Sequence, residues 1–223
     1  MKKAIVLLSG GVDSTVTLYH ALDKGYDCSV LIFDYKQRHK VEVKQAIKLA
    51  EKLNLAYKVV KIELPWGGSA LTDKNIAVPK NQKLDGKNIP ATYVPARNSI
   101  FLSFAFSFAE SIKASKIFIG AHIQDYSGYP DCRPEFLESI EKSIAMGLAN
   151  SKIKIEAPLL KLNKTQIIKK GLKYGIDFSQ TWSCYSGGKE ACGVCDSCLY
   201  RIRAFNELGL KDPVIKVNKK RSK

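Results

Sequence analysis

Residues 4–14 read AIVLLSGGVDS, and this stretch decides the fold. Its apolar run over residues 4–8 has the length and composition of a buried parallel strand. Polar and glycine residues follow over 9–14, and the apolar spacing of Val16 and Leu22 then predicts a helix. The N-terminus therefore predicts a strand, a glycine-rich turn and a helix start, which together open a parallel α/β sheet.

The turn carries the residue types of a phosphate-binding loop. Two consecutive glycines, Gly10 and Gly11, allow positive φ angles and a close approach of the backbone to a ligand. Inward N–H groups and a helix N-terminus attract anions, and Ser9 and Ser14 add hydroxyl donors. Neither the Walker spacing nor G-x-G-x-x-G is present. Asp13 beside phosphates indicates a bridging cation, hence a Mg²⁺–nucleotide complex.

SGGVDS after an N-terminal strand resembles the loop of the ATP pyrophosphatase superfamily. The resemblance implies cleavage of ATP between its α and β phosphates, adenylation of a substrate oxygen and release of pyrophosphate. A tight turn without a ligand is the alternative interpretation. We favour the phosphate site because the turns of α/β units rarely combine two glycines, two serines and an aspartate.

The rest of the chain alternates predicted strands and helices. Strands are expected over 29–33, 57–64, 116–121 and 153–157, and helices over 40–53, 97–111, 135–148, 164–174 and 199–208. The pattern predicts a doubly wound, five-stranded parallel sheet that binds ligands at the carboxyl ends of its strands, near the loops after Phe33, Leu64 and Gly120.

Three segments need separate expectations. The helix over 97–111 is apolar and aromatic nearly all round, so we expect it to be buried. The long segment 65–95 is interpreted as an active-site lid rather than a disordered excursion. We divide the chain into an ATP-binding α/β domain over residues 1–175 and a C-terminal zinc-binding segment over 176–223 that packs on it.

Composition narrows the class of protein. With 223 residues and 45% hydrophobic side chains, the chain supports one sizeable core. It has no apolar run of membrane-spanning length, and the five apolar residues after MKK are too few for a signal peptide, so a cytoplasmic protein is expected. The net charge of +15 is interpreted as a solvated lysine surface, since no aromatic residues interleave with the basic ones; a nucleic-acid partner is not expected.

Four cysteines near the C-terminus form the strongest metal signal. Cys184, Cys192, Cys195 and Cys198 have the spacing C-x7-C-x2-C-x2-C, which can close a tetrahedral structural zinc site. Disulfides would require an oxidising compartment, and a ferredoxin-type cluster would add C-x3-C-P, which is absent. We therefore predict one structural zinc ion.

Two further segments are expected at the ligand-binding edge. YVPARN, residues 93–98, places Arg97 at the mouth of a helix, where it can contact ATP or pyrophosphate. DYSGYPDCRPEF, residues 125–136, combines carboxylates, rings and an arginine that suit a flat heterocycle bearing a carboxylate. A polar turn that caps the following helix is the alternative interpretation for this second segment.

SGGVDS, FDYKQRH, YVPARN, GYPDCR and the cysteine segment occur in this order, and together they resemble the 7-cyano-7-deazaguanine synthase family over essentially the whole chain. The resemblance implies that 7-carboxy-7-deazaguanine is adenylated by ATP and that ammonia displaces AMP to give an amide. A second activation by ATP then leaves the nitrile, in queuosine and archaeosine precursor synthesis. It also implies an ATP-dependent carbon–nitrogen ligase that works as a homodimer.

The resemblance also implies site residues. Catalysis would fall to Asp13, which holds Mg²⁺, and to Arg97. Substrate contacts would come from Asp125, Tyr129, Asp131 and Arg133. ATP contacts would come from Arg97 and from Leu8, Ser9, Gly10, Gly11, Val12, Asp13, Ser14, Thr15, Val16, Thr17 and Leu18.

Two other classes of function stay open. An ATP-dependent tRNA-modifying enzyme with the same loop would explain the positive charge, although thiolation would need a cysteine pair and only Cys28 and Cys132 lie outside the metal cluster. A nucleotide-sensing or zinc-ribbon binding protein without chemistry is the second. Binding of tRNA that weakens with salt would support the first class, and product release that depends on the deazapurine would exclude the second.

Overall fold

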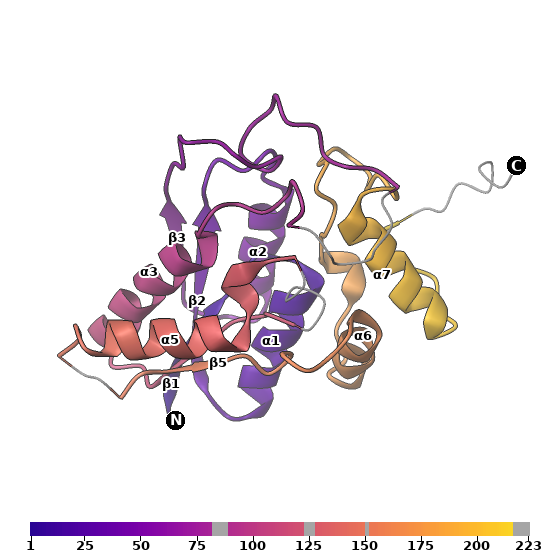
Figure 1. The fold of residues 1–223 in the computed structure, drawn as a ribbon. Helices are drawn as coiled ribbons and strands as arrows, with labels where there is room; N and C mark the ends of the chain where they lie inside the picture. Colours follow the sequence, from indigo (N-terminus) through magenta and orange to yellow (C-terminus); the bar gives the residue numbers. More distant parts are fainter. Residues whose placement is uncertain (82–88, 123–127, 150–151, 216–223) are drawn as a thin grey trace, which may run out of the picture.

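The computed structural model describes residues 1–81, 89–122, 128–149 and 152–215 (Figure 1). Strands and helices alternate along the chain, as the sequence predicts. The strands are β1 (Lys3–Leu7), β2 (Asp27–Asp34), β3 (Tyr57–Lys61), β4 (Lys116–Phe118) and β5 (Lys154–Glu156). The α-helices are α1 (Val12–Asp23), α2 (Val41–Lys52), α3 (Arg97–Ser111), α5 (Pro134–Ala145), α6 (Lys164–Lys173) and α7 (Asp196–Glu207). Short 3₁₀ turns lie at Pro130–Cys132 and Phe178–Gln180.

The five strands form one parallel sheet in the order β3-β2-β1-β4-β5. This arrangement confirms the predicted five-stranded, doubly wound sheet. The chain winds outward from β1 through β2 and β3, then crosses to the other side of β1 to form β4 and β5. The reversal opens a crevice at the carboxyl ends of β1 and β4, which is where ligands bind in open α/β sheets.

Side chains of β1 alternate between two cores. Val6 packs with apolar residues of α1 and α2, whereas Ile5 and Leu7 pack with α3 and α5. The sheet is therefore covered on both faces, which explains why β1 reads as a continuous apolar run rather than an alternating one.

Helix α3 has the predicted bounds, but the expectation that it is buried all round is wrong. Leu102, Ala105, Phe106 and Ala109 form its buried stripe, while Phe104 is 41% exposed. Phe101 is only partly buried, and its ring stacks on Phe33 of β2 with centroids 3.8 Å apart. Counting the aromatic residues of α3 therefore overestimated how much of the helix is buried, because a ring can stack on another ring without being fully enclosed.

The described parts of the expected lid, residues 65–81 and 89–95, are irregular but anchored. Ser69 and Ala70 are fully buried. The Arg38 side chain donates to the carbonyl oxygens of Ala70 at 2.9 Å and Ile76 at 2.7 Å. An irregular segment needs such partners for its backbone groups, so Arg38 holds this segment in place. Motion of a lid stays a prediction.

The C-terminal elements are tied to the sheet domain. Asn163 and Gln166 form a capping box at the start of α6, and the apolar sides of α6 and α7 pack with Val12 and Val16 of α1. The division at residue 175 stays a prediction, and one hydrophobic cluster crosses it. Across the described residues, no helix combines the length and apolar character needed to cross a bilayer.

Candidate active site

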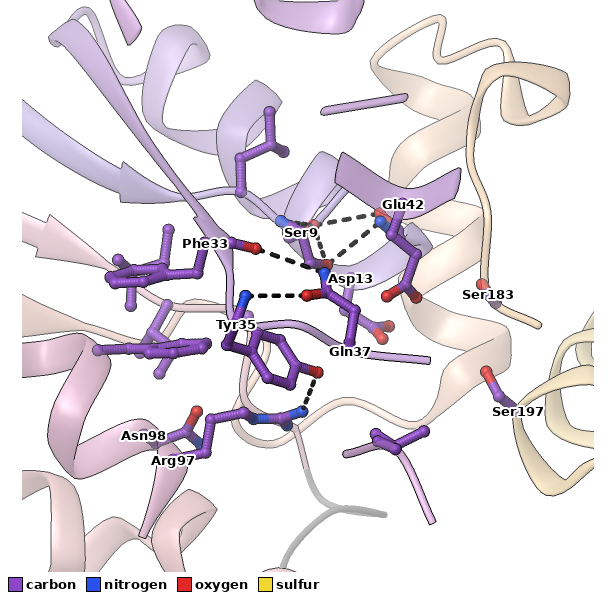
Figure 2. A pocket seen from close by; sticks show the side chains of 18 of the residues that line it. Ser9, Asp13, Phe33, Tyr35, Gln37, Glu42, Arg97, Asn98, Ser183 and Ser197 are labelled. Atoms are coloured by element: carbon purple, nitrogen blue, oxygen red, sulfur yellow. Dashed lines mark hydrogen bonds between the residues drawn. The ribbon is translucent and has the colours of Figure 1, made fainter. Parts of the chain in front are cut away.

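A cavity of about 240 Å³ opens at the carboxyl edge of the sheet, at the crevice between β1 and β4 (Figure 2). Its walls come from the 9–14 loop, the residues after β2, the start of α3, the residues after β4 and the cysteine segment. Leu71 and Thr92 of segment 65–95 also line it. The three expected loops therefore meet the glycine turn as predicted, because the carboxyl ends of parallel strands share one edge.

Hydroxyl groups stabilise the glycine turn from within. Ser14 Oγ accepts from the Ser9 N–H at 3.1 Å and lies 3.0 Å from Ser9 Oγ. Gly10 has φ +86°, and a Cβ there would lie 2.3 Å from the carbonyl oxygen of Glu42. Glycine is required at position 10 for both reasons, since the loop crosses directly over the backbone of α2.

The second glycine differs from the expectation that both adopt positive φ. Gly11 is the N-cap of α1 with φ −82°, which any residue can adopt. Leu8, Ser9, Gly11, Val12, Asp13 and Ser14 line the cavity. Thr15, Val16, Thr17 and Leu18 are buried in the core instead and lie outside the cavity lining in the described structure, so their predicted contacts with ATP stay untested.

Asp13 belongs to a compact polar cluster. The Lys164 Nζ lies 2.7 Å from both carboxylate oxygens of Asp13 and 3.1 Å from His122 Nε2, and His122 is 3% exposed. Burial works to raise the pKa of Asp13, but Lys164 and His122 hold it well below its ordinary value. The carboxylate is therefore ionised at neutral pH, with Lys164 as its close cationic partner.

Arg97 projects from the start of α3 into the cavity. Its Nη1 donates to the Tyr35 hydroxyl at 3.2 Å, and its guanidinium lies over the Tyr35 ring (Figure 2). Burial favours a lower pKa for Arg97, but Tyr35 and Asp131 raise it above the ordinary value, so the side chain carries a fixed positive charge. Such a charge suits a phosphate or an adenylyl group.

The first turn of α3 is held from outside the helix. The N-cap residue is Ala96, which has left-handed φ +53° and no side chain that can cap. Asp131 supplies the missing acceptor: its Oδ2 accepts from the Asn98 N–H at 2.9 Å. Asn98 Nδ2 then donates to the Asp131 carbonyl at 3.0 Å. Asp131 therefore fixes the helix start that carries Arg97.

The expected substrate loop divides into different environments. Tyr129 lines the cavity, and its hydroxyl lies 2.9 Å from Thr92 Oγ1. Asp131 is buried against α3, whereas Arg133 is exposed and outside the cavity lining. Asp125 lies outside the described residues. The substrate roles of these four residues stay predictions.

The four cysteines converge as expected. Their sulfur atoms all lie within 4.8 Å of one another, and Cys184, Cys195 and Cys198 are buried. A tetrahedral zinc ion with Zn–S bonds of ~2.3 Å requires sulfur atoms roughly 3.8 Å apart, so this cluster fits one. The Cys192 N–H donates to Cys184 Sγ at 3.2 Å, and the Cys195 N–H donates to Cys192 Sγ at 3.4 Å. Such bonds stabilise thiolate ligands.

The cysteine segment also completes the cavity. The Trp182 N–H donates to the Gly10 carbonyl at 2.9 Å, which joins this segment to the glycine turn. Ser183, Tyr185 and Ser197 line the cavity, and Figure 2 shows both serine hydroxyls directed toward it. The cysteine segment therefore supplies part of the cavity wall.

Three polar residues of the site were missed as site residues at the sequence level: Lys164, His122 and Glu42. Lys164 pairs with a residue 151 positions away, so no local spacing connects them. The sequence held one signal for Lys164: a lysine at the first position of a helix is unfavourable beside the positive end of the helix dipole, which suggests a carboxylate partner. Glu42 gave no such signal, because a negative charge in the first turn of α2 is favourable there.

The parallel sheet, the glycine turn at its switch point and the adjoining cavity define an α/β protein with the fold of the ATP pyrophosphatase, or PP-loop, superfamily. An NMN synthetase from Francisella tularensis has the same fold, with a TM-score of 0.50 and 15% identity over 98% of this chain and 79% of that one. The model of the family "Queuosine biosynthesis protein QueC" matches residues 3–209, and the chain belongs to that family.

Curated relatives match over nearly their full length. A 7-cyano-7-deazaguanine synthase from Nostoc punctiforme is 50% identical, with 96% of this chain and 99% of the relative covered. A protein of the same name from Picrophilus torridus is 49% identical, with 96% and 91% covered. A bacterial and an archaeal relative thus match this chain equally well.

Proposed function

We propose that the protein converts 7-carboxy-7-deazaguanine and ammonia to 7-cyano-7-deazaguanine at the expense of ATP, as a carbon–nitrogen ligase in queuosine and archaeosine precursor synthesis. The observation that carries the proposal is the 50% identity, over nearly the whole of both chains, to a protein named 7-cyano-7-deazaguanine synthase. The cavity beside the glycine turn supports a nucleotide-dependent reaction.

Each wall of the cavity has a role in this proposal. The turn at Ser9 and Ser14 binds the pyrophosphate that leaves, and Arg97 neutralises the adenylyl group during transfer to the carboxylate. Tyr129 contacts the flat deazapurine, with Asp125 and Arg133 as further contacts from the same loop. Asp131 supports the site indirectly through its bond to the N–H of Asn98.

Two metals belong to the proposal. Zinc would be held by the four cysteines, with a structural role that fixes the wall at Ser183 and Ser197. Asp13 would hold the Mg²⁺ that accompanies ATP after its pair with Lys164 opens; the ion would offset phosphate charge. The family resemblance also implies a homodimer, and sedimentation analysis would measure the oligomeric state.

The alternative of a tRNA-thiolating enzyme lacks a suitable cysteine pair in the described structure. Cys28 lies at the start of β2, where burial raises its pKa to about 12, whereas Cys132 lines the cavity at the other end of the sheet. Two thiols at opposite ends of the sheet cannot relay sulfur to one substrate.

Mass spectrometry of the products tests the function. We expect 7-carboxy-7-deazaguanine, ATP, Mg²⁺ and ¹⁵N-ammonium to yield the cyano product with one ¹⁵N atom, together with AMP and pyrophosphate. Reactions without ammonium are the control and should lack the nitrile. Failure to form nitrile, or turnover only when tRNA is added, would contradict the proposal.

A further inference from the structure

Glu42 is an acidic side chain in the cavity that the proposed roles leave unused. Asp13 and Glu42 are the acidic residues that line the cavity within the described structure. Asp13 is engaged by Lys164 at 2.7 Å. The Glu42 carboxylate has no hydrogen-bond or ion-pair partner among the described residues, although it lies in the first turn of α2 directly beside the loop.

The backbone of Glu42 is fixed to the glycine turn. Its carbonyl oxygen packs against Gly10, where even a Cβ would approach to 2.3 Å. The side chain faces the space into which Arg97, Ser183 and Ser197 also point (Figure 2). Glu42 therefore borders the same cavity as the arginine assigned to the adenylyl group and the wall formed by the cysteine segment.

We propose that Glu42 is the base that removes protons from the substrate nitrogen, and this inference rests on the proposed function. In the first stage, ammonia attacks the carbonyl carbon of the acyl adenylate. The carbon–nitrogen bond forms, the bond from carbon to the AMP oxygen breaks, and Glu42 takes one N–H proton. The products are the amide and AMP.

The second stage uses the same residue. The amide oxygen attacks the α-phosphorus of a second ATP, and pyrophosphate leaves. Glu42 then takes the two remaining N–H protons in turn, while the carbon–oxygen bond breaks toward AMP and the carbon–nitrogen triple bond forms. The amide oxygen leaves with AMP, so atoms balance without an oxidant or a reductant.

The charges around Glu42 suit a base that acts repeatedly near neutral pH. Burial raises the pKa of Glu42, Arg97 lowers it and the Cys184 sulfur raises it, and together they bring this pKa to about 7. Tyr35 also lies close enough to interact with Glu42, and its hydroxyl stays protonated because burial raises its pKa. Glu42 is only partly buried, so it can release each proton to water. The low pKa of Asp13 makes that carboxylate a poor base.

The test separates adenylation from nitrogen chemistry. Glu42→Gln should reduce nitrile formation at least ~100-fold, which is the range for loss of a general base. ATP–pyrophosphate exchange, which 7-carboxy-7-deazaguanine drives through adenylation alone, should fall less than about threefold. Glu51→Gln is the matched control, because Glu51 lies on the same helix, is exposed, and its carboxylate hydrogen-bonds only the Tyr57 hydroxyl among the described residues. At a constant concentration of unprotonated ammonia, the wild-type nitrile rate should fall below a pH of about 7, and Glu42→Gln should lose that limb.

Hydroxylamine provides a readout that a structural role would not move. It is unprotonated at neutral pH and a stronger nucleophile than ammonia, so the Glu42→Gln defect should shrink at least ~10-fold when hydroxamate formation is measured. Equal losses in exchange and nitrile formation, or an unchanged pH profile, would overturn the inference. If Glu42→Gln does not fold, Glu42→Ala, which also lacks the carboxylate, replaces it in the same assays. A wild-type enzyme that forms no nitrile would overturn the proposed function instead, and this inference with it.

Discussion

Replacing Gly10 by alanine should destabilise the protein more than its φ angle alone explains. The new Cβ would lie 2.3 Å from the Glu42 carbonyl oxygen and 2.9 Å from the Ala46 nitrogen, so α2 would have to move away from the loop. Left-handed backbone costs an alanine about 1–2 kcal/mol. Displacing a packed helix adds about 1–3 kcal/mol, by analogy with overpacked cores.

Gly25 provides the matched control for this substitution. Its φ of +75° is close to that of Gly10, but nothing lies within 4 Å of the position a Cβ would take. Gly25→Ala should therefore show the backbone term alone. Gly11→Ala, at φ −82° and 3.3 Å from Ser9 Oγ, should cost less than about 1 kcal/mol.

Thermal and urea denaturation of the three variants measure the difference. We expect Gly10→Ala to melt about 2–12 °C below Gly25→Ala, since 1 kcal/mol corresponds to roughly 2–4 °C in a chain of this size. Equal melting temperatures for these two variants would refute the argument that contact with α2, rather than φ alone, requires glycine at position 10.

Three further predictions concern charge and metal. Asp13→Asn should lower turnover at least ~100-fold while circular dichroism still shows a folded chain, because its carboxylate faces the cavity. Its melting temperature should fall, because Lys164 loses its charge partner at 2.7 Å; a fully active or unfolded variant would contradict the assigned role of Asp13. Cys195→Ser should lose bound metal, measured by elemental analysis, and stability together; a normal melt would show that the cluster is dispensable. Asp212→Asn should cost about 3–5 kcal/mol in urea denaturation, because it leaves the Arg201 guanidinium, 1% exposed, without its charge partner at 2.7 Å; a loss below about 1 kcal/mol would disprove this.

Fold prediction succeeded where local pattern and tertiary structure agree. The apolar run before SGGVDS became β1 with four buried residues, and α3 begins and ends at the predicted positions. Strand lengths were less predictable: β4 ends at Phe118, three residues before the predicted end. The apolar residues that follow it line the ligand edge instead, and composition alone does not distinguish these two environments.

The site was only partly predictable, because several of its contacts join residues that lie far apart in the sequence. The glycine turn and the cysteine cluster are local patterns with local geometry, so spacing identified them. Asp131 could be noticed as polar, but its bond to Asn98 N–H spans 33 positions and depends on the tertiary fold. The cluster of Asp13, His122 and Lys164 needs three separate segments to meet.

The bond between Trp182 N–H and the Gly10 carbonyl has a consequence for synthesis of the chain. The two residues lie 172 positions apart, so this side of the cavity can close only after the ribosome has synthesised Trp182. Such an order delays assembly of the site, since contacts between distant parts of a chain form slowly. A chain that terminates before Trp182 would thus lack Ser183, Tyr185 and Ser197, which form one wall of the cavity.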